Sequence, residues 1–398
     1  MSKNTHLEHL EDSILLDGKK GAEDAFKFLD SLARTFTGKG AGNFKMTTKW
    51  DGAPAIFCGQ YPGTNQFFVG TKSIFNKDAK INYTETDIDN NHGHAPGLTA
   101  KLKAALKYLP SIGIEGVVQG DLLFTDDKKV EVVDGKKSIT FKPNTITYAI
   151  PQEDSDYELA DAAKIGVVFH TTYTGTSIER LHASFGFDPS TLKKDKDVFV
   201  ISAEIDTLGK DVLLTSQEKQ KLIGLKQSSS QLVKTCGPFL DGVAKQIAEN
   251  DQLTIGVKLK QYFNKYVREG KQVGNSFTSD FKDYFSGECK KAADKVKQPK
   301  TKAAKLAKLY NGRDFIDGHG SQFDSTVKLY KIIQDAKEIF VTKLEKGEKF
   351  GTYIRTDNGL EMTAQEGYVA IKNGKATKLI KRLVFSQANF DVSLKGWS

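Results

Sequence analysis

Residues 44–60, FKMTTKWDGAPAIFCGQ, contain two short runs of β-branched and aromatic residues separated by an Asp-Gly-Ala-Pro segment. Runs of this kind bounded by turn residues are typical of β-strands. The same texture recurs up to residue 173, in QFFVGTK, GVVQGDLLF, SITF, TITYAI and GVVFHTTY. The pattern predicts a mostly antiparallel strand region over residues 43–173, interrupted by one helix at residues 98–109.

Apolar residues at helical spacing occur near the start of the chain and again in its second half. Ala25, Leu29 and Leu32 form one such stripe, and another begins at Ile255. Stripes of this period are typical of amphipathic helices that bury one face. After residue 351 strand-like runs return, in TYIRT, GYVAIK and ATKLIKRLVF.

These patterns predict an α+β fold in three segments. Residues 1–176 and 351–398 would together form a domain of antiparallel sheets with flanking helices. Residues 177–350 would form a mainly helical insertion within that domain.

The composition excludes several classes of protein. With 398 residues, 38% of them hydrophobic, the chain can bury a large core and is not mainly disordered. Its three cysteines are widely spaced, which argues against a disulfide framework and a disulfide-linked partner. There is no apolar run of about 18 residues and no signal-peptide pattern, so we expect a cytoplasmic protein without membrane contact. The net charge of +8 permits a polyanionic partner.

The segment Lys49-Trp50-Asp51-Gly52 is the most informative part of the sequence. A lysine attacks phosphorus only when it is unprotonated, so a nucleophilic lysine needs surroundings that lower its pKa. Taken alone, the segment also fits a strand that ends in an Asp-Gly turn.

Four further segments follow in an order that gives KWDG more weight. KWDG resembles motif I of the covalent nucleotidyltransferase superfamily, which contains DNA ligases, RNA ligases and mRNA capping enzymes. QGDLLF (residues 119–124) resembles motif III, and VVFHTTY (167–173) is similar to motif IIIa. EGYV (366–369) resembles motif IV, and TKLIKR (377–382) resembles motif V.

The resemblance implies a ligase-type nucleotidyltransferase domain that uses ATP and Mg²⁺. It implies that Lys49 attacks the α-phosphate of ATP to form lysyl-AMP, and that Asp51 and Gly52 belong to the same nucleotide-binding motif. Asp121 and Glu366 would contact the ribose and the divalent metal ion, for which carboxylate and phosphate oxygens are suitable ligands.

The remaining implied roles concern the base and the phosphates. Phe169 would give the adenine a face for stacking. Lys378 and Lys381 would hold the α-phosphate during transfer, and Lys72 would contact an incoming 5′-phosphate.

The chain departs from the family pattern at several positions. Asp121 replaces the usual glutamate of motif III, and His170 replaces the usual acid of motif IIIa. Lys378 and Lys381 are three residues apart rather than two, so they would face opposite sides of a regular strand. Few residues follow motif V, too few for the OB-fold domain that is common in DNA ligases and capping enzymes.

The resulting hypothesis is an ATP-dependent polynucleotide ligase of the phage RNA ligase type, located in the cytoplasm of the host. It would join a 5′-phosphate to a 3′-hydroxyl, with RNA ends favoured and nicked DNA as the alternative. Two other possibilities remain open: a catalytically degenerate nucleic-acid-binding protein with a ligase-like fold, and a GTP-using capping enzyme.

Residues 290–308, KKAADKVKQPKTKAAKLAK, contain eight lysines and one acid, Asp294. Such a segment fits a surface that binds the phosphates of a nucleic acid. It fits a solvated helix face equally well.

Overall fold

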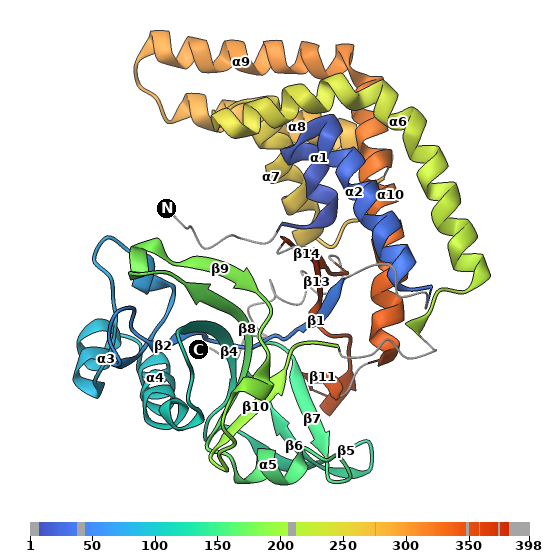
Figure 1. Ribbon diagram of the computed structural model, residues 1–398. Helices are drawn as coiled ribbons and strands as arrows, with labels where there is room; N and C mark the ends of the chain where they lie inside the picture. The colour runs from blue at the N-terminus through green and yellow to red at the C-terminus, as the bar shows by residue number, and fades with distance from the viewer. Residues whose placement is uncertain are drawn as a thin grey trace.

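The protein has the predicted α+β fold. A helical part and a sheet-rich part lie next to each other, as Figure 1 shows. No helix in the described ranges is both long enough and apolar enough to cross a membrane. The computed structural model describes residues 8–37, 44–205, 212–274, 276–347, 350–357, 359–372 and 375–381.

The helical part combines the start of the chain with its second half. Its helices share one hydrophobic core, to which both Leu29 and Phe340 belong. The longest helix begins with a capping box between Thr215 and Glu218. The elements of this part are η1 (Leu10–Asp12), α1 (Ser13–Leu16), α2 (Gly18–Thr35), α6 (Ser216–Glu249), α7 (Ile255–Arg268), α8 (Phe277–Asp294), α9 (Pro299–Gly318) and α10 (Gly320–Leu344).

A six-stranded sheet forms the centre of the other part. It has the order β10-β8-β4-β2-β3, with β9 paired to β8, and all its pairs are antiparallel except β8 with β10. The helices α3 (Glu85–His92) and α4 (Pro96–Tyr108) lie beside it, and Leu102 of α4 shares a core with Ile56 and Val118 of the sheet. The strands are β2 (Ala55–Gln60), β3 (Phe67–Gly70), β4 (Val117–Phe124), β8 (Ile165–Thr174), β9 (His182–Phe185) and β10 (Val198–Ser202).

A five-stranded antiparallel sheet packs against the six-stranded one. Their shared core contains Phe124 and Phe199 from the first sheet and Phe141 and Tyr148 from the second. α5 (Tyr157–Ala162) adds Tyr157 to this core. In order, the strands are β12 (Gly359–Met362), β11 (Gly351–Thr356), β7 (Thr147–Pro151), β6 (Lys136–Phe141) and β5 (Lys129–Val133).

A small antiparallel sheet, β1-β13-β14, connects the two parts. Tyr368 and Ala370 of β13 belong to the helical core, whereas Val369 and Ile371, between and beyond them, line a pocket. This alternation is the two-residue period of a strand with different surroundings on its two faces. The strands are β1 (Lys45–Lys49), β13 (Gly367–Lys372) and β14 (Lys375–Leu379).

The structure places the segment boundaries differently from the prediction at residues 176 and 177. β9 and β10 extend the six-stranded sheet, so the helices of the second half begin at Ser216. The helices at the start of the chain pack in the helical core rather than on the sheets. An apolar stripe predicts that a helix buries one face, but it does not indicate which core receives that face.

Candidate active site

Lys49 and Glu366 form an ion pair where β1 and β13 meet. Lys49 is the last residue of β1 and pairs in register with Gly367, so Glu366 comes just before the same point on the neighbouring strand. The two side chains are 28% and 12% exposed. A Cβ atom on Gly367, which has a φ of +147°, would lie 2.7 Å from the carbonyl oxygen of Leu379. Glycine therefore allows the end of β14 to approach this corner of the sheet.

The carboxylate of Asp51 is occupied by hydrogen bonds to a neighbouring loop. It accepts bonds from the side chain of Asn144 (2.8 Å) and from the backbone N–H groups of Thr145 (2.7 Å) and Ile146 (2.8 Å). Its own backbone N–H donates to the hydroxyl of Tyr148 at 2.7 Å. Asp51 is 3% exposed and does not line the pocket. These bonds position the end of β1, and the implied part of Asp51 in nucleotide binding stays a prediction.

Gly52 brings Asp121 close to the segment that contains Lys49. A Cβ atom at Gly52 would lie 2.4 Å from the Cβ atom of Asp121, so a side chain does not fit there. The backbone N–H of Ala53 donates to the carbonyl oxygen of Leu122 at 3.0 Å and fixes this approach. Gly52 thus serves the site through close backbone packing.

The charges around Lys49 do not lower its pKa. Burial lowers the pKa of Lys49, but the neighbouring carboxylates, Glu366 foremost and then Asp121 and Asp51, raise it more, and the net direction is upward. Burial raises the pKa of Glu366 to about 7, against the opposing effect of Lys49. The expected depression of the lysine pKa is therefore absent in this arrangement, because a carboxylate contacts the amine directly.

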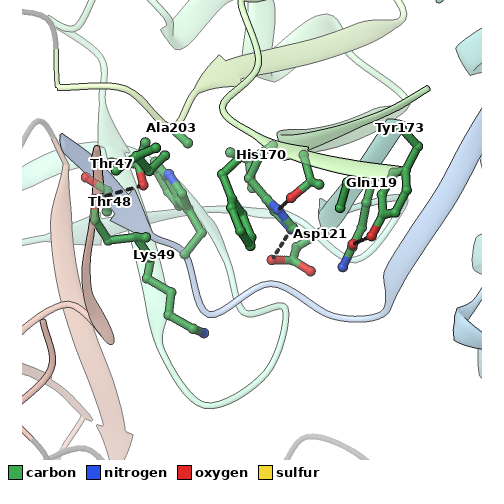
Figure 2. A pocket seen from close by; sticks show the side chains of 15 residues that line it. Thr47, Thr48, Lys49, Gln119, Asp121, His170, Tyr173 and Ala203 are labelled. Atoms are coloured by element: carbon green, nitrogen blue, oxygen red, sulfur yellow. Dashed lines mark hydrogen bonds and ion pairs between the residues drawn. The ribbon is translucent and has the colours of Figure 1, made fainter. Parts of the chain in front are cut away.

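A pocket opens beside Lys49 between the small sheet and the six-stranded sheet. Figure 2 shows His170 and Asp121 between Lys49 on one side and Gln119 with Tyr173 on the other. The hydroxyl of Tyr173 donates to Oε1 of Gln119 at 2.8 Å, and Nε2 of His170 lies 3.6 Å from Oδ2 of Asp121. The other lining residues are Thr47, Thr48, Trp50, Val168, Thr171, Ala183, Phe185, Ala203, Val369 and Ile371.

An irregular pairing of β8 decides which of its residues face the pocket. Phe169 pairs with Gly120 and Thr171 pairs with Gln119, so His170 is an extra residue in β8. A bulge of this kind disturbs the alternation of side chains. Val168, His170 and Thr171 line the pocket.

Phe169 points to the other side of the sheet. It is 1% exposed, and its ring centroid lies 5.2 Å from that of Phe187. The expected stacking of adenine on Phe169 is therefore wrong, because the ring is already buried in the core of the sheet. The rings that line the pocket are those of Trp50, His170, Tyr173 and Phe185. The position of Phe185 at the pocket was not predicted, because the sequence of β9 matches no motif.

Of the two lysines predicted to hold the α-phosphate, Lys378 lies on the pocket side of the small sheet and Lys381 contacts the helical part. Lys378 pairs with Val369, which in turn pairs with Thr47, and directly opposed residues share one face of a sheet. The Cβ of Lys378 is therefore on the pocket face. Lys381 instead forms an ion pair with Glu345 at 2.5 Å, at the edge of the helical part.

Lys72 lies after β3 in η2 (Lys72–Phe75), and its side chain is exposed. Gly70, the last residue of β3, pairs with Phe57, which in turn pairs with Gln119 of β4. Lys72 therefore follows the end of β3 that lies level with Gln119. It does not line the pocket.

The described ranges contain no group of three or more His, Cys, Asp or Glu side chains that could hold a metal ion by themselves. Asp121 and Glu366 both act on the charge of Lys49, so both carboxylates lie near it. They offer two oxygen donors rather than a complete cage. Such a pair suits an ion that takes its other ligands from water or a phosphate.

Comparison with known proteins gives one match. No curated protein and no solved structure matches the chain. The Family of unknown function (DUF6267) matches residues 4–395, and the chain therefore belongs to this family.

Proposed function

We propose that this protein is an ATP-dependent polynucleotide ligase that works through a lysyl-AMP intermediate on Lys49. The observation that carries the proposal is the pairing of Lys49 with Glu366, near Asp121, at the edge of a pocket lined by rings and hydroxyl groups. These residues come from motif-like segments that are 317 residues apart at most, from Lys49 to Glu366. RNA ends are the favoured substrate, and nicked DNA is the alternative.

The pocket offers suitable surroundings for a nucleotide. Its volume is about 140 Å³. A cavity of about 150 Å³ holds a benzene ring, so the pocket has space for the ring of a base. Phe185 and His170 provide faces for stacking, and Thr47 and Gln119 provide polar groups.

The carboxylates fit a magnesium ion that arrives with the nucleotide. Mg²⁺ is usually bound by one or two carboxylates together with substrate phosphates, and Asp121 and Glu366 form a donor pair of that size. Such an ion would supply positive charge beside Glu366, and this charge would lower the pKa of Lys49.

The first step forms one bond and breaks one. The protonated amine of Lys49 first releases a proton to solvent, because Glu366 would serve as a ligand of the metal ion in this step. The neutral Nζ attacks the α-phosphorus of ATP, the P–N bond forms, and the P–O bond to pyrophosphate breaks. A second proton leaves the nitrogen with the pyrophosphate or to solvent. The product is the lysyl-AMP phosphoramidate.

The later steps transfer AMP and seal the strand. A 5′-phosphate attacks the phosphorus of lysyl-AMP and displaces Lys49, and a 3′-hydroxyl then attacks the activated 5′-phosphate and releases AMP. We assign contacts with these phosphates to Lys378, whose Cβ lies on the pocket face, and to Lys72, which follows β3.

Incubation with α-labelled ATP and Mg²⁺ tests the proposal. We expect label on the wild-type protein and none on Lys49→Ala. Lys45→Ala is a matched control, because Lys45 lies on the same strand and also pairs with a carboxylate, Glu204 at 2.9 Å; it should label normally. A wild-type protein that takes up no label from ATP or GTP would rule out covalent nucleotidyl transfer.

The raised pKa of Lys49 favours a second candidate, a polynucleotide-binding protein that keeps this fold without catalysis. Such a protein would bind nucleic acid without any dependence on nucleotide. Calorimetric titration with ATP and Mg²⁺ separates the two candidates, because only the ligase needs a nucleotide site.

A further inference from the structure

The hairpin formed by α8 and α9 projects from the helical part. Figure 1 shows α9 along the outer edge of the molecule, at the opposite end from β5 and α5. The two helices pack closely: a Cβ atom on Gly312 of α9 would lie 2.1 Å from the ring of Phe285 on α8. Buried Phe277, Phe281 and Phe285 fix α8 in the helical core. The hairpin is therefore a firmly packed arm.

The end of this arm carries positive charge that the other described residues do not neutralise. Lys291, Lys302 and Lys308 pair with Glu288 (3.3 Å), Asp294 (3.2 Å) and Asp251 (2.9 Å), respectively. The other exposed lysines at the tip have no ion pair within the part of the chain that the structure describes. These are Lys290, Lys295, Lys297 and Lys300.

The pattern of α9 differs from that of an ordinary solvated helix. Exposed helix faces usually carry both signs of charge, in pairs three or four residues apart. In α9 the first acid is Asp314, after four lysines and one arginine. A helix with this many lysines and no acid among them suits a partner with closely spaced negative charges.

The surface between the lysines favours a nucleic acid over other polyanions. Ala303, Ala304 and Ala307 are exposed and small, so they allow a phosphate backbone to approach the helix. Tyr310, farther along α9, is 63% exposed. An exposed aromatic ring beside lysines provides a face on which a base stacks.

We propose that the α8–α9 hairpin binds the phosphodiester backbone of a polynucleotide. The inference rests on the proposed function for the identity of the bound strand as the ligation substrate. It adds that the substrate is long enough to contact both the arm and the pocket. The helical core that fixes α8 also contains Tyr368 and Leu379 of the small sheet, so the arm and Lys49 share one rigid support.

Binding of labelled oligonucleotides to the full chain tests the inference. The arm variant is Lys290→Gln/Lys295→Gln/Lys297→Gln/Lys300→Gln. The matched control, Lys129→Gln/Lys136→Gln/Lys137→Gln/Lys164→Gln, removes the same charge from exposed lysines at the other end of the molecule. Fluorescence anisotropy is measured with RNA and DNA strands of about 30 and about six nucleotides, from 50 to 200 mM salt.

We expect the arm variant to bind the long strands at least tenfold more weakly and the control variant to bind like wild type. Each phosphate contact on a single strand contributes about 0.7 to the salt slope, so the slope should fall by up to about 3 for four contacts. Affinity for the short strands should change little. Comparison of the affinities for RNA and for DNA identifies the preferred backbone.

Three outcomes would overturn the inference. Both variants could bind nucleic acid as wild type does, both could lose affinity to the same extent, or the protein could bind anionic lipid vesicles and neither nucleic acid. The labelling of Lys49 by ATP is measured on the same samples and should be unchanged in the arm variant. Absence of label with normal arm-dependent binding would reject the proposed function and leave the arm's role intact.

Discussion

Two lysine–glutamate pairs lie on opposite sides of the small sheet, and they differ in their surroundings. Lys337 of α10 contacts Glu11 at 2.7 Å on the helical side, and the two side chains are 1% and 0% exposed. Lys49 contacts Glu366 on the pocket side, with 28% and 12% exposure and further carboxylates nearby. The same pair of residue types is enclosed in one place and open in the other.

The difference separates an enclosed ion pair from one that ligands can reach. Around Lys337 the fixed partner holds the charge, and burial makes any change costly. Around Lys49 negative charge exceeds positive charge, so a cation and a phosphate can enter and redistribute the protons. A partly exposed pair with excess carboxylate is therefore the one suited to chemistry.

The largest expected effect is on stability. Lys337→Met removes the cation from the buried Glu11 and should lower the free energy of unfolding by about 3–5 kcal/mol. Lys49→Met should lower it less, because Glu366 is partly exposed and, with its pKa raised to about 7, can take up a proton when the cation is removed. Urea unfolding of both variants measures the difference.

The double variant Glu11→Leu/Lys337→Met is the control for this prediction. Apolar residues in place of a buried ion pair are often neutral or stabilising, so the double variant should recover most of the lost stability. Equal destabilisation by Lys337→Met and Lys49→Met would contradict the contrast between the two pairs.

The next effect is on the reactivity of Lys49. Glu366→Gln removes the largest influence that raises the pKa of Lys49, so more of the amine is neutral at a given pH. A fall of one pKa unit gives about a tenfold faster reaction with an acylating reagent at pH 8. Mass spectrometry of the peptide that contains Lys49 measures the rate.

Lys45 provides the internal control on the same strand. Its side chain is 63% exposed, so Glu204→Gln should change its acylation less than about twofold. The gain in Glu366→Gln should also shrink below pH 7, because the pKa of Glu366 is raised to about 7 and the wild-type carboxylate is then itself protonated. Unchanged acylation of Lys49 in Glu366→Gln would show that the carboxylate does not control the amine.

Local patterns in the sequence were enough to predict the α+β class and most strands. The strand runs predicted in residues 44–60 correspond to β1 and β2, and the helix predicted at residues 98–109 corresponds to α4. The prediction that Lys49 and Glu366 share one site was based on the order of the motif-like segments. Periodicity alone does not give the register of strands so far apart in the chain.

Other features depend on contacts that no local pattern reports. The orientation of Phe169 follows from the extra residue His170, and an irregular pairing is not visible in a strand-like run such as VVFHTTY. The carboxylate of Asp51 is fixed by Asn144 and its neighbours, 93 to 95 residues away. The helices at the start of the chain pack in a core whose other helices begin at Ser216 or later.

The smallest expected effect concerns the two lysines near the end of β14. Lys381 and its partner Glu345 are 26% and 22% exposed, so Lys381→Ala should lower the free energy of unfolding by about 1 kcal/mol or less. Its amine is engaged with the helical part, and labelling of Lys49 by ATP should stay within about twofold of wild type.

Lys378→Ala is the matched comparison, because Lys378 lies three residues before Lys381, on the pocket face of β14. Loss of a charge-assisted contact to a phosphate costs about 1.5–3 kcal/mol, so labelling should slow by roughly 10- to 100-fold. Slow labelling by Lys381→Ala together with normal labelling by Lys378→Ala would reverse the assignment. It would mean that the Lys381–Glu345 pair opens when nucleotide binds, and that the helical side of the small sheet takes part in the chemistry.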